Sequence, residues 1–162
     1  MKRLGLLIAI VILVLDQVSK QWVVMDGLQS RFISEVTSFF NLVLVWNRGV
    51  SFGMLSNHPE WMPIILTIVA LAITAMLLVW LWKAESRLAA ISLGFVIGGA
   101  IGNIIDRILY GAVVDFLDFH LNEWHWPAFN IADAAIFIGV VLLLIETIIE
   151  PKQRAAPTTS ET

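Results

Sequence analysis

The sequence predicts an all-α membrane protein with four transmembrane helices, both termini in the cytoplasm and a small β-containing segment outside the membrane. Of its 162 residues, 59% are hydrophobic and only 14% are charged, and the mean hydropathy is +0.85. A soluble domain is about 25% charged and leaves roughly a third of its unfolded surface exposed to water, so this chain needs lipid around it. Four windows contain the about 20 mostly apolar residues that a spanning helix requires: 4–24, 61–82, 89–109 and 131–149.

The first window is the least regular of the four. Its unbroken apolar run ends at Leu15 and is followed by four polar residues within 16–20. A short apolar run behind Lys2 and Arg3 also fits a cleavable signal peptide. No small-x-small cleavage site follows, however, and the apolar pattern continues to Val24. We therefore expect a retained helix.

The distribution of basic residues predicts the orientation. With four spans, six basic residues fall on one side of the membrane: Lys2, Arg3, Lys83, Arg87, Lys152 and Arg154. The positive-inside rule makes that side cytoplasmic. Tryptophans, which prefer membrane interfaces, fall near both ends of the predicted spans. We expect one membrane domain over 1–151 and a polar cytoplasmic tail over 152–162.

Two segments, 25–60 and 110–130, are left outside. The first contains the β-branched and aromatic run 39–46, bounded by Ser38 and by Asn47-Arg48-Gly49, which predicts one or two short strands with a glycine-containing turn. The second is broken by charges and Pro127 and is expected to connect the third and fourth helices. Within the third helix, glycines at 94, 98 and 102, with Gly99 adjacent, predict a groove for a closely packed helix.

Polar residues in the helices gather near the outer leaflet. At 1.5 Å per residue, Asp16 lies about 12 Å and Asn103 about 9 Å below the outer ends of their helices, with Lys20 and Arg107 one turn above them. An ionisable group in the membrane costs about 2.5–3.5 kcal/mol, which favours a functional interpretation. The alternative is structural: an Asp16–Lys20 ion pair, an interhelical hydrogen bond from Asn103, and an Arg107 that reaches the lipid headgroups. Both remain open.

Asp115 and Asp133 differ in their surroundings. Asp115 has apolar neighbours, which raise an aspartate pKa, whereas Asp133 follows the predicted N-cap Asn130 in the first turn of a helix, which lowers it. Two nearby carboxylates that share one proton are what an aspartic hydrolase requires. The alternative is a helix-capping Asp133 and a solvated Asp115, and spacing does not exclude three other carboxylates: Asp106, Asp118 and Glu123.

The amino-acid composition limits the kinds of catalytic and metal site that the chain can form. The chain has no cysteine and three histidines, which excludes thiol catalysis and disulfides and disfavours a metal site. We expect no cofactor. A net charge of −3 without a basic stripe excludes a nucleic-acid partner.

Five motifs resemble those of the bacterial lipoprotein signal peptidases (signal peptidase II), a family of aspartic endopeptidases. In chain order they are DQVSK at 16–20, NRGVSF at 47–52, GGAIGNIIDR at 98–107, VVDF at 113–116 and FNIAD at 129–133. The resemblance implies removal of the signal peptide from prolipoproteins whose cysteine carries diacylglyceryl. It also implies a site at the outer face of the bacterial cytoplasmic (inner) membrane, contact with membrane lipids, no metal, and inhibition by the cyclic peptide globomycin. We expect a monomer.

The resemblance also implies residue roles. Asp115 and Asp133 correspond to the catalytic dyad. The supporting and substrate-binding residues are Asp16, Lys20, Asn47, Gly49, Asn103, Arg107 and Asn130. The glycine groove either leaves room for the signal-peptide helix or only packs helices.

The main rival is a small proton-coupled transporter, which also buries charged residues in a bundle. A transporter predicts polar groups in both leaflets. The second and fourth windows have no ionisable residue in their inner halves until Glu146. A structural assembly factor, the third possibility, does not explain two carboxylates at one depth, so an enzyme is favoured.

Overall fold

Four long helices form the membrane part of the protein. The structure is a computed structural model that describes residues 1–27, 33–49 and 61–154. The helices are α1 (Lys2–Gly27), α2 (Met62–Lys83), α3 (Arg87–Tyr110) and α4 (Ile131–Arg154), and each contains a stretch long and apolar enough to cross a membrane. The four predicted helices are thus confirmed. α1 runs without a break through the polar stretch at 16–20, and α4 continues past its predicted end at 149.

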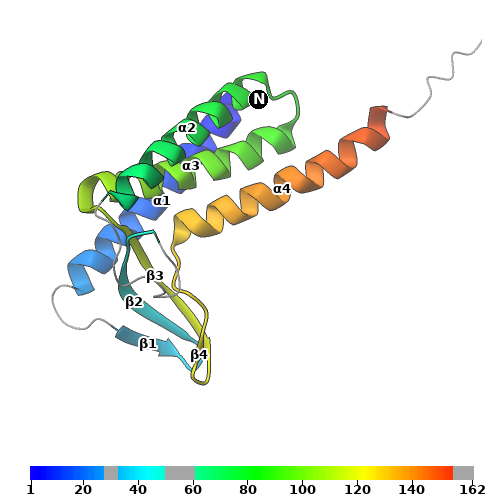
Figure 1. The fold of residues 1–162 in the computed structure, drawn as a ribbon. Coiled ribbons are helices and arrows are strands. Elements are labelled where there is room, and N and C mark those ends of the chain that lie inside the picture. Colours follow the sequence, from blue (N-terminus) through cyan, green and yellow to red (C-terminus); the bar gives the residue numbers. More distant parts are fainter. Residues whose placement is uncertain (28–32, 50–60, 155–162) are drawn as a thin grey trace, which may run out of the picture.

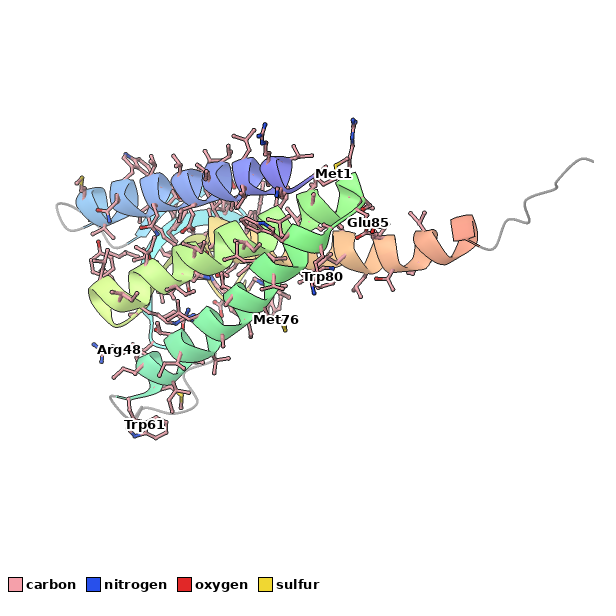
Figure 2. All side chains as sticks on the ribbon, turned by 90° about the horizontal axis from the view of Figure 1, so that it is seen from above. Met1, Arg48, Trp61, Met76, Trp80 and Glu85 are labelled. Atoms are coloured by element: carbon pink, nitrogen blue, oxygen red, sulfur yellow. The ribbon has the colours of Figure 1, made fainter. Side chains whose placement is uncertain are left out.

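α3 is the central helix of the bundle and contacts α1, α2 and α4. In its most apolar stretch 67% of the residues are buried, against 17% in α2 and in α4, so those two helices offer most of their surface to lipid. The far part of α4 stands away from the other helices (Figure 1). Met1 and Glu85 lie at one end of the bundle, and Trp61 and Arg48 lie at the other (Figure 2).

The glycine groove of α3 holds α1. A Cβ atom at Gly94 would lie 2.5 Å from the carbonyl oxygen of Gly5, and one at Gly98 would lie 2.6 Å from that of Ala9. The backbones of the two helices therefore touch where only glycine permits it. Because α1 fills the groove, the idea that it leaves room for a substrate helix is wrong.

A four-stranded antiparallel sheet extends from the end of the bundle opposite the N-terminus (Figure 1). Its strands, in spatial order, are β1 (Ile33–Thr37), β2 (Phe40–Asn47), β3 (Val113–Leu121) and β4 (Trp124–His125). β2 confirms the strand predicted around 39–46. β3 and β4 lie in the segment that was expected only to connect two helices, so that expectation was incomplete.

β3 joins the sheet to the helices. α3 ends at Tyr110 and is capped by Gly111, whose φ of 66° allows the left-handed turn that leads into β3. Val114 and Phe116 then pack with Val23 of α1 and Leu44 of β2 in a small apolar core. Pairing between β2 and β3 places Asn47 opposite Val113. The predicted site residues of three distant segments therefore meet where the sheet joins the helices.

Candidate functional site

Two asparagines connect Asp115 and Asp133. Asn130 Nδ2 donates to Asp115 Oδ1 at 2.7 Å, and Asn103 Nδ2 donates to Asp133 Oδ1 at 2.8 Å. Asn130 Nδ2 also lies 3.3 Å from Asn103 Oδ1, so the two amides form one chain between the carboxylates. Asp115 is 1% exposed, whereas Asp133 is half-buried at the start of α4. The arrangement leaves one carboxylate enclosed and the other accessible.

Asn130 has the capping role that the sequence predicted. Its Oδ1 accepts the backbone N–H of Asp133 at 2.9 Å. This bond satisfies one free donor of the first turn and fixes where Asp133 begins the helix. The same residue thus orients both aspartates, one through its oxygen and one through its nitrogen.

Asn47 contacts Asp115 from the opposite side. Its Nδ2 donates to Asp115 Oδ2 at 2.9 Å, while its Oδ1 accepts the N–H of Gly49 at 2.8 Å. Gly49 has a φ of 110°, a left-handed backbone conformation that residues with a side chain rarely adopt. Gly49 therefore forms the turn that holds the Asn47 amide, and Asn47 contacts the Asp115 carboxylate directly. The rest of the second motif, 50–52, lies outside the described residues.

Burial raises the pKa of Asp115 to about 6, and the negative charge of Asp133 acts in the same direction. Hydrogen bonds from Asn47 and Asn130 stabilise the ionised form and lower this pKa, but burial outweighs them. The direction is the one expected for an aspartate with apolar neighbours. Asp115 therefore holds a proton at pH values where an ordinary aspartate has lost it.

Behind the two aspartates lies a buried charge cluster of Asp16, Lys20 and Asp106. Lys20 Nζ lies 2.8 Å from Asp16 Oδ2 and 2.9 Å from Asp106 Oδ2, and it donates to Asn103 Oδ1 at 2.9 Å. All three charged residues are at most 1% exposed. The predicted Asp16–Lys20 pair exists, but it is incomplete without Asp106. Sequence reasoning named Asp106 only as one alternative carboxylate.

Gln17 is a member of this cluster that sequence reasoning missed. Its Nε2 contacts Asp106 Oδ1 at 2.9 Å and the carbonyl of Gly102 at 3.2 Å, and it also reaches Asp16 at 3.2 Å. The signals in the sequence were its place beside Asp16 and its place in the motif DQVSK at 16–20.

Arg107 lies at the edge of the site. Its Nη1 donates to the carbonyl oxygen of Asn103 at 3.3 Å, and its buried Nε has no hydrogen-bond partner among the described residues. The guanidinium interacts electrostatically with Asp133, Asp106 and Asp115.

Asp118 belongs to a separate group on the sheet. It accepts from Asn41 Nδ2 at 3.1 Å and contacts His125 Nδ1 at 2.9 Å. No hydrogen bond joins it to the two aspartates in the described part of the chain. Within 1–27, 33–49 and 61–154 no cluster of three histidines or carboxylates has the arrangement of a metal site.

Comparisons with known proteins identify the family. The model of the family described as Signal peptidase (SPase) II matches residues 8–149. The chain is 45% identical over 161 residues to a lipoprotein signal peptidase of Rhodopseudomonas palustris strain TIE-1, covering 96% of this chain and 98% of the relative. It is 44% identical over 149 residues to one of Polynucleobacter necessarius, covering 89% and 91%.

Solved structures agree with this assignment. A bacterial membrane enzyme determined by the in meso method at 1.9 Å has a TM-score of 0.73 and 30% identity, covering 90% of this chain and 92% of that one. A second, at 2.3 Å, has a TM-score of 0.75 and 29% identity, covering 98% and 93%. The chain belongs to the signal peptidase II family.

Proposed function

We propose that this chain is an aspartic endopeptidase that removes the signal peptide from diacylglyceryl-modified prolipoproteins, with Asp115 and Asp133 as its catalytic residues. Membership of the signal peptidase II family gives the reaction its class, a peptidase of lipoprotein maturation. The observation that supports the aspartic mechanism is the pair itself. One buried and one accessible carboxylate are joined by the amides of Asn103 and Asn130.

The two carboxylates suit different roles. Asp115, with its raised pKa, is the protonated partner. Asp133 is assigned as the base, because its carboxylate lies at a helix start, where free N–H groups favour a negative charge. Asp133 takes a proton from water as the water oxygen attacks the scissile carbonyl carbon, and Asp115 donates a hydrogen bond to the developing oxyanion. The C–N bond then breaks as the leaving nitrogen receives a proton from the dyad.

The surrounding polar groups hold the pair and the substrate. Asn47, Asn103 and Asn130 fix the carboxylate orientations through the bonds described above. Arg107 has free donors beside Asp133 and suits a substrate carbonyl. Asp16 and Lys20 support the site from α1, and Gly49 shapes the segment that carries Asn47.

The location of the pair suits a substrate that remains in the membrane. The aspartates lie where the bundle meets the sheet, and the lipid-facing surfaces of α2 and α4 leave acyl chains free to approach from the side. We place this end at the outer face of the bacterial cytoplasmic membrane, with both termini inside. The chain acts as a monomer in one domain over 1–151, requires no cofactor, and is blocked by globomycin.

The test is cleavage of a diacylglyceryl-modified prolipoprotein by the purified protein in lipid, followed as a size shift. Asp115→Asn and Asp133→Asn should each reduce turnover about 10³-fold or more, because neither asparagine exchanges the dyad proton. Asp118→Asn is the matched control, since it removes a buried carboxylate of the sheet that contacts His125 instead. Globomycin should block the wild type, and a chelator should not.

Turnover by either dyad variant within tenfold of the wild type would refute the assignment. Inhibition by a chelator that added zinc reverses would indicate a metal hydrolase.

A further inference from the structure

Two buried carboxylates outside the proposed dyad each hold the backbone directly before a dyad residue. Asp106 Oδ2 accepts the N–H of Val114, which precedes Asp115, at 3.0 Å. Asp16 Oδ1 accepts the N–H of Ala132, which precedes Asp133, at 2.9 Å. We propose that Asp106, aimed by Gln17 and linked through Lys20 to Asp16, is a positioning residue that sets the separation of the two catalytic aspartates. The proposal rests on the function proposed above.

Both backbone donors lack a partner in secondary structure. Ala132 lies in the first turn of α4, where N–H groups have no intrahelical acceptor. Val114 lies opposite Trp46 in the β2–β3 pair, but its N–H and its carbonyl oxygen bond the side chains of Asp106 and Asn130 and so face away from β2. A buried N–H must find an acceptor, so each carboxylate is the anchor of one chain segment.

Lys20 joins the two anchors. Its Nζ lies between Asp16 Oδ2 and Asp106 Oδ2, at 2.8 Å and 2.9 Å. None of the three side chains reaches water, because each is at most 2% exposed. A buried carboxylate that moved away from the ammonium would lose the ion pair that Lys20 forms with it, so both carboxylates are held tightly. The β3 and α4 segments are therefore tied to one nitrogen atom.

Gln17 determines which oxygen of Asp106 faces the strand. Its Nε2 donates to Asp106 Oδ1 and leaves Oδ2 to Val114 and Lys20. The same amide group reaches the carbonyl of Gly102 in α3. Without Gln17 the Asp106 carboxylate can rotate, although its charge stays paired.

Neither Asp106 nor Gln17 forms a hydrogen bond to the dyad side chains in the described structure, so their loss should change rate rather than substrate binding. A displacement of about 1 Å at reacting groups costs about 100-fold in rate. We expect Asp106→Asn to lower kcat by about that factor and to leave KM within about twofold of the wild type. Gln17→Met, which keeps the length of the side chain and every charge, should lower kcat by about tenfold.

The experiment compares kcat and KM per folded protein with a diacylglyceryl-modified prolipoprotein, well below each variant's unfolding midpoint. Ser92→Ala is the matched control, because Ser92 is buried in the same helix and bonds only the carbonyl of Leu88. It should leave kcat and KM unchanged.

Each result decides the proposal. A wild-type kcat for folded Asp106→Asn, even with a lower unfolding midpoint, would show a purely structural role and overturn it. If Asp106→Asn does not fold, Gln17→Met decides, and an unchanged kcat overturns the proposal. A rise in KM alone would also overturn it. Turnover by Asp115→Asn or Asp133→Asn refutes the proposed function instead, so the two failures are distinguishable.

Discussion

Lys20 pairs with two buried carboxylates, those of Asp16 and Asp106. We therefore expect three variants of this cluster to differ in their free energy of unfolding. Lys20→Met leaves Asp16 and Asp106 without their counter-charge. Both contact the same Nζ at 2.8 Å and 2.9 Å, so their oxygens lie less than about 6 Å apart. Two charges at this separation repel by about 3 kcal/mol at an effective dielectric constant of 20. Loss of the buried ion pair with Lys20 costs about another 3–5 kcal/mol.

Asp16→Ala has a smaller effect, because Lys20 and Asp106 remain as a neutral pair. We expect a loss of about 3 kcal/mol, the low end for a broken buried pair. The double variant Asp16→Ala with Lys20→Met leaves one unpaired carboxylate but no repulsion. It should therefore be about 3 kcal/mol more stable than Lys20→Met alone.

Unfolding in detergent micelles, followed by the fluorescence of the seven tryptophans, measures this order. Thr74→Val is the control, because Thr74 is a buried residue of α2 that bonds only the carbonyl of Ala70 and takes part in no ion pair. If Asp16→Ala destabilises as much as Lys20→Met, or if the double variant is the least stable of the three, Lys20 is not shared between two carboxylates. The cluster would then consist of one ion pair and a third side chain that is uncharged.

Three further predictions concern other parts of the molecule. Asn47→Leu removes a hydrogen bond that stabilises ionised Asp115, so its pKa should rise above about 6 and the pH profile of kcat/KM should move to higher pH; an unmoved or lowered profile would contradict this. Gly98→Ala forces a Cβ against the α1 backbone and should cost about 1–3 kcal/mol in unfolding, whereas no loss would mean that the helices separate freely. A cysteine at Asn122 should react with a membrane-impermeant thiol reagent in spheroplasts and one at Arg87 should not, and the reverse labelling would invert the proposed topology.

The helices were predictable because their signal is local. A run of about 20 apolar residues identifies a spanning helix without any knowledge of its neighbours. β2 was predictable for the same reason, since it contains the β-branched or aromatic residues Phe40, Val43, Val45 and Trp46. β3 was not, because Asp115 and Asp118 interrupt its apolar pattern. Its partner β2 lies about 70 residues earlier in the chain, a pairing that no local pattern contains.

The site residues also fall into two groups: those that a local pattern predicts and those that only contacts between distant segments bring together. The Asp16–Lys20 pair followed from helical spacing alone, which places residues four apart on one face. Asp106 completes the cluster from another helix, and only the approach of α1 to α3 brings it there. A Cβ atom at Gly102 would overlap the Asp16 carboxylate, so the glycine that appeared to serve helix packing also leaves room for a charged group.

In the part of the chain that the structure describes, the buried charged network at the sheet end has no counterpart at the opposite end of the bundle. There α1, α2 and α3 meet through an apolar core that includes Ala9, Leu81 and Ile97. Ser86 Oγ donates a hydrogen bond to Glu146 of α4 at that end. A proton-coupled transporter needs polar groups along a path to both faces, whereas among the described residues the buried cluster of charged side chains lies at one end of the bundle. This asymmetry favours chemistry on a substrate that approaches from a single side.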